Sequence, residues 1–167
     1  MALGSSREYD LTSQITPPDN KLYRCRIVYD ANSFDIEYIP YQKRVIQTLQ
    51  TVQADHLDYR LKYADRTKLN ELFSQRDEAD DILIIQNNLV TDTSIANIAF
   101  FDGKRWITPK KPLLKGTTRA RLLDEKKIFE QDINVTDLQK FSEFALMNAM
   151  IGFDEIKDGI IRPLKGF

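Results

Sequence analysis

The sequence predicts a mixed α/β (α+β) fold in which short strands outnumber helices. Apolar and polar residues alternate over 22–29 and again over 34–39, which is the period of half-buried strands. Asn87-Asn88 and Asp102-Gly103 each separate two apolar runs, and both dipeptides favour tight hairpin turns. Helical patterns are confined to short segments. The core is therefore expected to be built on sheets.

The composition is that of a globular protein without an obvious charged partner. The 167 residues suffice for one good core or two small ones. The net charge is −1 and the basic residues are scattered, which argues against nucleic acid or an acidic membrane as partner. We see no apolar run of about 20 residues and no signal-peptide pattern. A cytoplasmic protein is expected.

Cysteine and histidine are each present once, which excludes several site classes. Cys25 alone forms no intramolecular disulfide or thiolate metal cluster. His56 alone rules out the usual zinc constellations and a histidine-based triad, and it is expected to be a solvated loop residue. An enzyme with this sequence would use a general base other than histidine.

The N-terminal part is predicted to be a polar lead-in followed by a hairpin over 22–39. Arg24 and Arg26 are expected to face Asp35 and Glu37 across it. The alternative is that an arginine here, Arg26 above all, contacts a ligand carboxylate.

Beyond Pro40 the main domain is expected to begin, with strands over 45–52 and 57–65. Lys62 would lie on the face opposite Tyr59 and its neighbours, at a strand end just before a helix. Asp65 is a plausible N-cap for that helix, which is expected to end near Ala79. An isolated lysine is usually a solvated surface group, and a functional lysine is the alternative.

The next stretch is predicted to be a series of hairpins around a polar corner. Strands are expected over 82–85 and 95–101, with a return at 105–107. The corner is Thr91-Asp92-Thr93-Ser94. Polar corners between apolar strands suit the binding of a phosphate or a ring nitrogen.

Two threonines open the next predicted helix. Thr117 and Thr118 follow Gly116, and hydroxyls beside free helical N–H groups make a natural anion cradle. A simple threonine N-cap is the alternative interpretation.

The last elements predicted are a strand over 129–133, a helix with a capping box at 136–139, and a strand over 144–147. Asn148 ends that strand, and a partly buried asparagine there either fixes a loop or contacts a ligand. The tail from Phe153 is assigned no chemistry.

Five segments with functional residues occur in a specific order: 61–66, 89–98, 106–109, 114–119 and 147–150. Together they resemble the fold-type IV pyridoxal phosphate (PLP) enzymes, which include branched-chain and D-amino-acid aminotransferases and 4-amino-4-deoxychorismate lyase. The resemblance implies a D-amino-acid aminotransferase-like fold. Residues 45–167 would be its PLP-binding domain, a mixed-sheet pseudo-barrel, and 1–44 a remnant of its small N-terminal α+β domain.

The resemblance implies a role for two charged residues in particular. Lys62 matches the lysine that forms the Schiff base with PLP and then serves as a proton-transfer base. Asp92 matches an acid, usually glutamate, that keeps the ring nitrogen protonated. The aspartate is shorter by one methylene.

The resemblance also implies roles for smaller polar residues. Ser94 and Asn97 match the turn that supports the acid and approaches the phosphate, although Asn97 is equally suited to a structural role. Thr117 and Thr118 match the phosphate cradle.

Asn148 and Met150 match the substrate side of the cofactor and look most like the lyase subgroup. The implied reaction converts 4-amino-4-deoxychorismate to 4-aminobenzoate and pyruvate, on the route to folate. The resemblance also implies that the enzyme is a homodimer. The alternatives are an amino-acid transaminase that uses the same lysine and a non-catalytic remnant of the fold. The family carries a longer N-terminal segment with an arginine that pairs with the phosphate, and this segment has no match here.

Overall fold

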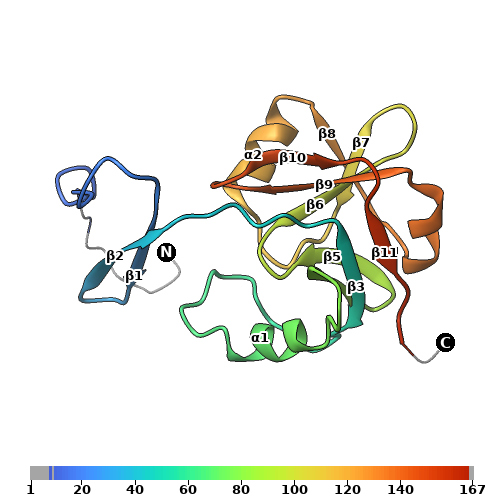
Figure 1. Cartoon of the computed structure of the whole chain (residues 1–167), viewed down its shortest axis with the longest axis horizontal. Coiled ribbons are helices and arrows are strands. Elements are labelled where there is room, and N and C mark those ends of the chain that lie inside the picture. Colours follow the sequence, from blue (N-terminus) through green and yellow to red (C-terminus); the bar gives the residue numbers. More distant parts are fainter. Residues whose placement is uncertain (1–7, 9, 166–167) are drawn as a thin grey trace. The chain divides into compact units, whose positions relative to one another are not determined.

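The computed structural model describes residue 8 and residues 10–165. The chain divides into two compact units, residues 1–44 and 45–167 (Figure 1). In the described part of the chain, no helix has the length and apolar character that crossing a bilayer requires.

The first unit contains the predicted hairpin. β1 (Tyr23–Tyr29) pairs antiparallel with β2 (Phe34–Pro40). The register places Arg26 opposite Glu37, and Nη1 of Arg26 donates to the Glu37 carboxylate at 2.9 Å. Arg24 lies opposite Ile39 instead of a carboxylate. The cross-strand pair is therefore confirmed for Arg26 and Glu37, whereas the expected Arg24–Asp35 pairing is wrong.

The second unit contains nine strands in its described residues and two α-helices with one 3₁₀ helix. The strands are β3 (Thr48–Gln53), β4 (Asp81–Gln86), β5 (Leu89–Thr93), β6 (Asn97–Phe101), β7 (Trp106–Pro109), β8 (Ile128–Gln131), β9 (Glu143–Asn148), β10 (Gly152–Ile156) and β11 (Ile160–Arg162). The helices are α1 (Thr67–Ser74), α2 (Thr117–Asp124) and the 3₁₀ helix η1 (Val135–Lys140).

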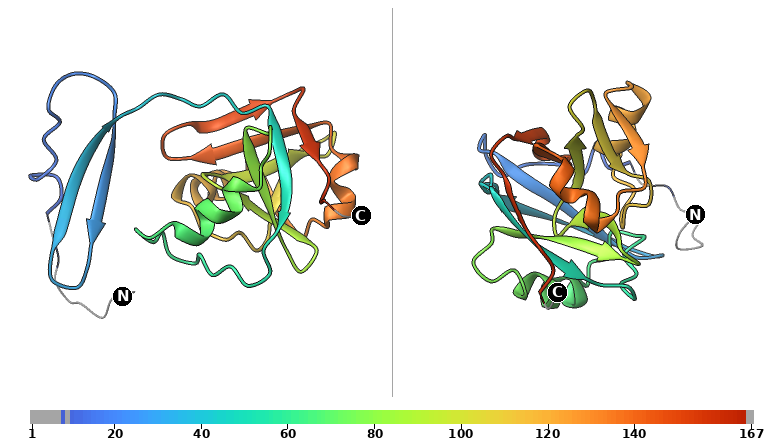
Figure 2. Two further views of the ribbon diagram at one scale, coloured as in Figure 1. Left: turned by 60° about the horizontal axis from the view of Figure 1, so that its bottom comes forward. Right: turned by 90° about the vertical axis from the view of Figure 1, so that its right-hand side faces the viewer.

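These strands form one mixed sheet, which confirms the predicted fold class. Its order is β10-β9-β6-β5-β4-β3-β11, and β7 branches off by pairing with both β6 and β8. β3 runs parallel to β4 and to β11, and β7 runs parallel to β8, while the other pairs are antiparallel. Figure 2 shows β3, β4 and β5 side by side with α1 next to them.

The largest core cluster lies on the inner face of the sheet. Its members include Leu49, Leu83, Phe100 and Phe144, which come from β3, β4, β6 and β9. Because strands from both halves of the sheet contribute to one cluster, the sheet curls around it, as the predicted pseudo-barrel requires.

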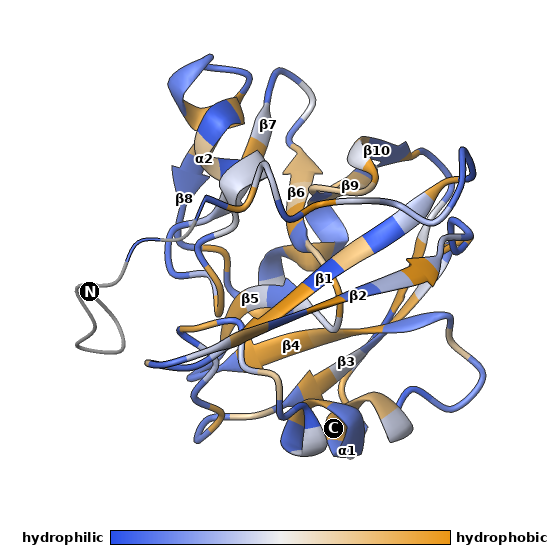
Figure 3. Cartoon of the chain, turned by 90° about the vertical axis from the view of Figure 1, so that its left-hand side faces the viewer, coloured by the Kyte–Doolittle hydropathy of each residue, from blue (hydrophilic) through white to orange (hydrophobic). Residues whose placement is uncertain are grey.

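β4 is buried on both of its faces. Leu83 points to the inner cluster, whereas Ile82 and Ile84 pack with Leu69 of α1 on the other side. Figure 3 shows this strand as a largely hydrophobic band. Burial on both faces explains its almost continuous apolar sequence.

α2 packs beside the other half of the sheet. Leu122 lies in a small buried cluster with Ala99 of β6, Ile128 of β8 and Met147 of β9. This packing holds α2 against β6, β8 and β9.

Both hairpin turns are confirmed. Asn87 and Asn88 have φ values of 49° and 63°, and Gly103 has a φ of 91°. Asparagine and glycine tolerate this left-handed region better than other residues.

The strand predicted over 57–65 is wrong, because this segment is a loop without a strand partner. Its apolar alternation does not reflect two faces of a sheet, since Leu61 and Tyr63 are 43% and 41% exposed. Asp65 does accept the N–H of Thr67 at 2.8 Å, but the N-cap position belongs to Arg66. α1 also ends at Ser74, five residues before the expected end.

Two predicted caps are placed differently in the structure. The capping box of η1 is formed by Asn134 and Asp137, so the box predicted at 136–139 is wrong. α2 has Gly116 at its N-cap position and no side-chain cap, so the threonine N-cap is also wrong. The tail forms two strands, β10 and β11, which the sequence did not predict.

Candidate functional site

The polar corner between β5 and β6 contains three of the predicted site residues, Asp92, Ser94 and Asn97. We refer to residues 92–97 as the acid corner. Asp92 and Asn97 are paired across it, at the ends of the two strands. The Thr93 hydroxyl accepts the N–H of Ala96 at 3.1 Å and closes the turn. The corner is therefore a fixed local structure.

Asp92 is buried, with 4% of its surface exposed. Its Oδ1 accepts a hydrogen bond from Asn97 Nδ2 at 2.8 Å, and its Oδ2 accepts one from the Leu114 N–H at 2.9 Å. A carboxylate offers about four acceptor positions, so acceptor capacity remains on both oxygens. Asp92 can accept a further donor from a ligand.

Burial raises the pKa of Asp92 from 3.8 to about 6, because desolvation disfavours the charged form. The hydrogen bonds from Leu114 and Asn97, the charge of Arg119 and the backbone N–H of Leu113 lower the pKa, but they do not cancel the effect of burial. At pH 7 the group is therefore mostly ionised. A cationic group placed beside it would lower its pKa again.

Asn97 also joins the acid corner to the start of α2. Its Nδ2 donates to the Leu114 carbonyl at 2.7 Å. A Cβ on Gly116 would lie 2.2 Å from Asn97 Oδ1, so this position accepts no side chain without a shift. The segment before α2 is thus held directly against Asp92 and Asn97.

The N-terminal end of α2 carries an unbalanced positive charge. It has no side-chain cap and no acidic residue in its first turn. Thr117 and Thr118 open the helix, the first exposed and the second buried. Free N–H groups and the helix dipole both favour an anion at this position.

Arg119 lies in the first turn of the same helix and carries a buried positive charge that is paired with Glu130. Its guanidinium is almost fully buried, and Nη2 donates to the Pro109 carbonyl and to Glu130, both at 2.7 Å. Its Nε has no hydrogen-bond partner among the described residues. A buried cation in a first helical turn opposes the dipole, and an anion at the helix end would relieve this.

Lys62 lies exposed in the loop between β3 and α1 rather than at a strand end. The loop is connected to the acid corner through Arg66, whose Nη2 donates to the Ser94 carbonyl at 2.9 Å. Ser94 itself is buried. The structure therefore links the segment that contains Lys62 with the corner that contains Asp92.

Asn148 approaches the acid corner from β9. Its Nδ2 donates to the Ile95 carbonyl at 3.1 Å, and its Oδ1 accepts the N–H groups of Met150 and Ile151 at 2.8 and 3.1 Å. Of the two interpretations of Asn148, the loop-fixing one is observed. Met150 follows in the turn after β9 and is half-buried.

Arg26 and His56 complete the set of residues that the sequence singled out, and the role of Arg26 as a ligand contact stays a prediction. Arg26 belongs to the first unit, where it pairs with Glu37. His56 is exposed in a turn, as expected. Among the described residues, no group of three or more acidic, histidine or cysteine side chains is placed to hold a metal ion.

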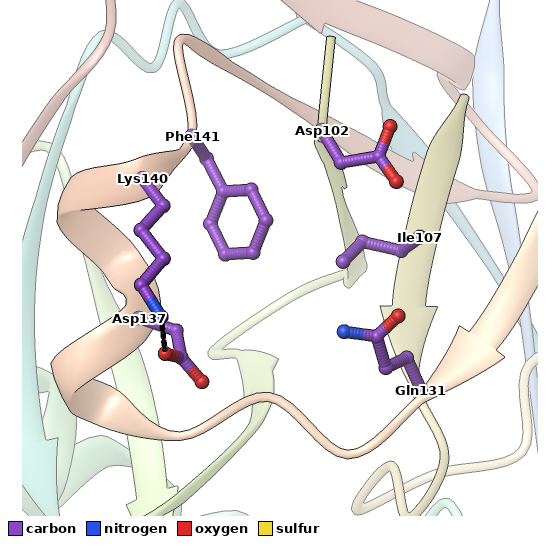
Figure 4. A pocket seen from close by; sticks show the side chains of 6 residues that line it. All are labelled: Asp102, Ile107, Gln131, Asp137, Lys140 and Phe141. Carbon is purple, nitrogen blue, oxygen red and sulfur yellow. Dashed lines mark hydrogen bonds and ion pairs between the residues drawn. The ribbon is translucent and has the colours of Figure 1, made fainter. Parts of the chain in front are cut away.

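Two hollows in the second unit lie near η1 and away from the acid corner. The first has a volume of about 290 Å³ and is shown in Figure 4, with Phe141 and the Asp137–Lys140 ion pair on one side and Ile107 on the other. The second, of about 380 Å³, is mostly apolar. Neither is lined by a predicted site residue.

Several residues that shape this site were not individually predicted from the sequence. They are Arg66, Leu114, Gly116 and Arg119. Leu114 acts through its backbone, which a sequence pattern does not report. A glycine immediately before a threonine-rich helix start was the available signal for Gly116, because close backbone approaches select glycine.

Comparison with known proteins gives this arrangement a family. Residues 22–157 match the model of the amino-transferase class IV family. The chain belongs to this family. The enzymes of this family depend on PLP. We therefore ask whether the residues of the site fit this cofactor.

Two of the similar proteins described below are provisionally named aminodeoxychorismate lyases. A protein of Haemophilus influenzae without a characterised function is 46% identical over 144 residues, which are 86% of this chain and 77% of that protein. A crystal structure from Haemophilus somnus, provisionally named a 4-amino-4-deoxychorismate lyase, is 44% identical with a TM-score of 0.79, over 87% of this chain and 78% of that one. A Schizosaccharomyces pombe protein, provisionally named an aminodeoxychorismate lyase, is 39% identical over 58% of this chain and 44% of its own length.

The residues of the second unit fit two parts of PLP, its phosphate and its ring nitrogen. The start of α2, with its threonines and the orphaned Nε of Arg119, suits a phosphate. Asp92 has spare acceptor capacity and its charge lacks a directly bonded cation, which suits a protonated ring nitrogen. Both features are joined through Asn97 and Leu114, so they are held at a fixed spacing.

Proposed function

We propose that the protein is a PLP-dependent lyase that converts 4-amino-4-deoxychorismate to 4-aminobenzoate and pyruvate. The observation that carries the proposal is the direct link between the buried Asp92 and the uncapped start of α2. Asn97 and Leu114 form this link within 2.9 Å contacts. An acid and an anion cradle at fixed spacing are what a phosphorylated pyridine needs.

The phosphate would be held by the start of α2. Thr117 and Thr118 offer hydroxyls and free N–H groups, and the buried charge of Arg119 favours the dianion. The internal hydrogen bonds of Asp92 orient its carboxylate before any ligand arrives. Asp92 would accept the N–H of the ring nitrogen and keep it protonated.

Lys62 would supply the amine and the base. Bound PLP supplies an aldehyde carbon that captures amines and a ring that draws electrons away from the substrate. The Lys62 amine would hold the cofactor in the absence of substrate and, once free, would take the proton from the substrate carbon that bears the amino group. Loss of pyruvate and formation of the aromatic ring complete the reaction. No histidine is needed.

The choice of lyase rests on the relatives of similar sequence. The Haemophilus somnus and Schizosaccharomyces pombe proteins both carry the lyase name, at 44% and 39% identity. Asn148 and Met150 would lie toward the substrate, on the side of the acid corner reached from β9. We also propose that residues 45–167 form the cofactor domain, that 1–44 belong to a small domain, and that the enzyme is a cytoplasmic homodimer.

A first experiment tests cofactor binding through Lys62. Purified protein is mixed with PLP, and a Schiff-base absorbance band in the near-visible region is expected. Lys62→Ala should abolish the band, because only a primary amine at that position forms the linkage. Lys68→Ala, an exposed lysine on the neighbouring α1, serves as the matched control and should leave the band unchanged. The absence of a band in the unmodified protein at any PLP concentration would exclude the enzyme and favour a non-catalytic remnant.

A second experiment separates the lyase from a transaminase. The protein loaded with PLP is supplied with 4-amino-4-deoxychorismate in the absence of any keto acid, and pyruvate and 4-aminobenzoate are measured. Release of both supports the lyase. A strict requirement for a keto-acid acceptor would instead assign an amino-acid transaminase.

A further inference from the structure

The loop that contains Lys62 lacks the support of a sheet. We refer to residues 57–66 as the lysine segment. Its described hydrogen bonds between backbone groups are local, such as Leu57 N–H to the Ala54 carbonyl and Tyr63 N–H to the Leu61 carbonyl, and at its start Gln86 of β4 donates from Nε2 to the Leu57 carbonyl at 2.8 Å. Lys62, Leu61 and Tyr63 are exposed. A segment of this kind samples many conformations unless specific side chains restrain it.

The guanidinium of Arg66 connects Tyr59, near the start of the lysine segment, and the end of the segment to the acid corner. Arg66 donates from Nη2 to the Ser94 carbonyl at 2.9 Å and from Nη1 to the Tyr59 hydroxyl at 3.2 Å. Tyr59 is itself anchored, because its ring is buried in the cluster that includes Val52 and Leu69. Lys62 lies between the two tied residues, three positions after Tyr59 and four before Arg66.

The geometry of this contact requires arginine. A guanidinium presents donors in a rigid planar fork, so one side chain reaches two acceptors in different directions at once. A lysine ammonium at position 66 is a point donor on a flexible stem, and a glutamine amide lacks the charge. Replacement of Arg66 therefore removes at least one of the two contacts that close the segment.

A second arginine in the same segment provides a contrast. Arg60 pairs with Asp58 through two hydrogen bonds of 3.0 and 2.9 Å, and its side chain is 83% exposed. Both partners belong to the lysine segment, so this pair does not connect the segment to the acid corner. Arg60 and Arg66 thus differ in what they join, while both are close to Lys62 in sequence.

We infer that Arg66 is a positioning residue that holds the lysine segment against Ser94, so that the Lys62 amine is presented to an aldehyde held at the acid corner. The inference rests on the proposed function for the role of Lys62. The restraint itself follows from the contacts of Arg66 and is independent of any ligand. Arg66 would act by positioning Lys62, and we assign it no contact with the reacting atoms.

The restraint is tested first in the protein without cofactor. Amide hydrogen exchange over residues 57–66 is compared in the unmodified protein, Arg66→Gln, Tyr59→Phe and the control Arg60→Gln. Arg66→Gln should accelerate exchange in this segment by about tenfold or more, because a hydrogen bond from a charged donor is lost. Tyr59→Phe keeps the buried ring and should give a smaller increase. Arg60→Gln should resemble the unmodified protein.

The effect on Lys62 is tested with two probes that share a phosphate and a pyridine ring. PLP has an aldehyde, and its attachment to Lys62 is trapped with borohydride and located by mass spectrometry. Pyridoxine 5′-phosphate has an alcohol in that place, so it reports binding without the amine. Arg66→Gln should slow trapping at Lys62 by about tenfold or more. It should change the affinity for pyridoxine 5′-phosphate by less than about twofold.

The outcomes separate the inference from the proposed function. Unchanged exchange and unchanged trapping in Arg66→Gln would overturn the inference. If the unmodified protein binds no probe and shows no trapping, the proposed function fails, and the exchange measurement still decides whether Arg66 restrains the segment. If Arg66→Gln does not fold, Tyr59→Phe and Arg66→Lys carry the same comparison. A loss of affinity for pyridoxine 5′-phosphate as large as the loss of trapping at Lys62 would indicate a general structural role and also contradict the inference.

Discussion

At the scale of single residues, Asp92 combines the burial of a core residue with the charge of a site residue. Its exposed fraction is 4%, and two internal donors hold its oxygens. The protein does not neutralise this group with a directly bonded cation. A cationic ligand that binds beside Asp92 would therefore offset the unfavourable free energy of burying its charge.

The raised pKa of Asp92 predicts how stability depends on pH. Its pKa is about 6 in the folded protein and near 3.8 when exposed, so the folded state retains a proton that the unfolded state releases between these values. The stabilising contribution is fully present below about pH 4 and is lost as the pH rises through 6. Relative to Asp92→Asn, the free energy of unfolding should fall by about 3 kcal/mol across this range.

This prediction is checked by urea unfolding of both proteins from pH 4 to pH 7.5. The difference between them isolates Asp92, since the other titrating groups are shared. A difference that is constant over this pH range would contradict the raised pKa. The slope should also shrink when PLP is present, because a protonated ring nitrogen lowers the pKa of Asp92.

At the scale of elements, α2 is held by the residues of its own first turn. Arg119 reaches back from this turn to Pro109, at the end of β7, and to Glu130 in β8. Gly116 admits the side chain of Asn97 against the backbone. The start of the helix is thereby fixed to two strands and to the acid corner at the same time.

Substitution of Arg119 should affect stability more than substitution of its neighbour Arg121. Arg119→Met removes a charged donor from the buried Pro109 carbonyl and should lower the free energy of unfolding by about 2 kcal/mol. Arg121→Met removes an exposed ion pair with Glu125 and should change it by less than about 0.5 kcal/mol. Chemical denaturation of both variants gives the comparison, and equal effects would contradict the structural role of Arg119.

Local chemistry explains which elements the sequence predicted correctly. The hairpin over 22–39 and the turns at Asn87-Asn88 and Asp102-Gly103 follow from side-chain alternation and from residues that tolerate positive φ. The strand predicted over 57–65 failed because Tyr59 is buried by tertiary packing, while Leu61 and Tyr63 alternate with it by chance. Alternation indicates a strand only where a neighbouring strand is present to pair with it.

The candidate site was predictable to a similar degree. Asp92 and Asn97 lie together at the acid corner and Thr117 and Thr118 open α2, because each lies near the end of a regular element, while their roles in cofactor binding stay predictions. The link through the Leu114 backbone depends on the path of a loop, which no residue pattern encodes. The contact from Arg66 to a carbonyl 28 positions later is equally hidden from the sequence.

At the scale of the whole molecule, β11 forms one end of the sheet of the second unit. β11 pairs in parallel with β3, and side chains reinforce this contact: Thr51 donates to the Arg162 carbonyl at 2.8 Å and Gln50 to the Pro163 carbonyl at 2.7 Å. β3 therefore has a partner on both of its edges. The edge of the sheet passes to β11, which is only three residues long.

Deletion of residues 160–167 should therefore destabilise the second unit. β3 would lose its backbone partner and the two side-chain contacts, and we expect a loss of about 3 kcal/mol or more in the free energy of unfolding. Deletion of 166–167 retains all of β11 and serves as the control. The two truncated proteins are compared by thermal unfolding and by light scattering, and equal stability would show that β11 contributes little.

The β3–β11 pairing can form only late in the synthesis of the protein. Thr51 and its acceptor, the Arg162 carbonyl, are 111 positions apart. At about 5–20 residues per second, the ribosome needs roughly 6–22 seconds to add that length of chain. During this interval the outer edge of β3 is without its final partner, and a nascent chain nearby presents the same edge. Because β3 contains the polar residues Gln50, Thr51 and Gln53, it should pair with another nascent chain less readily than an apolar strand would.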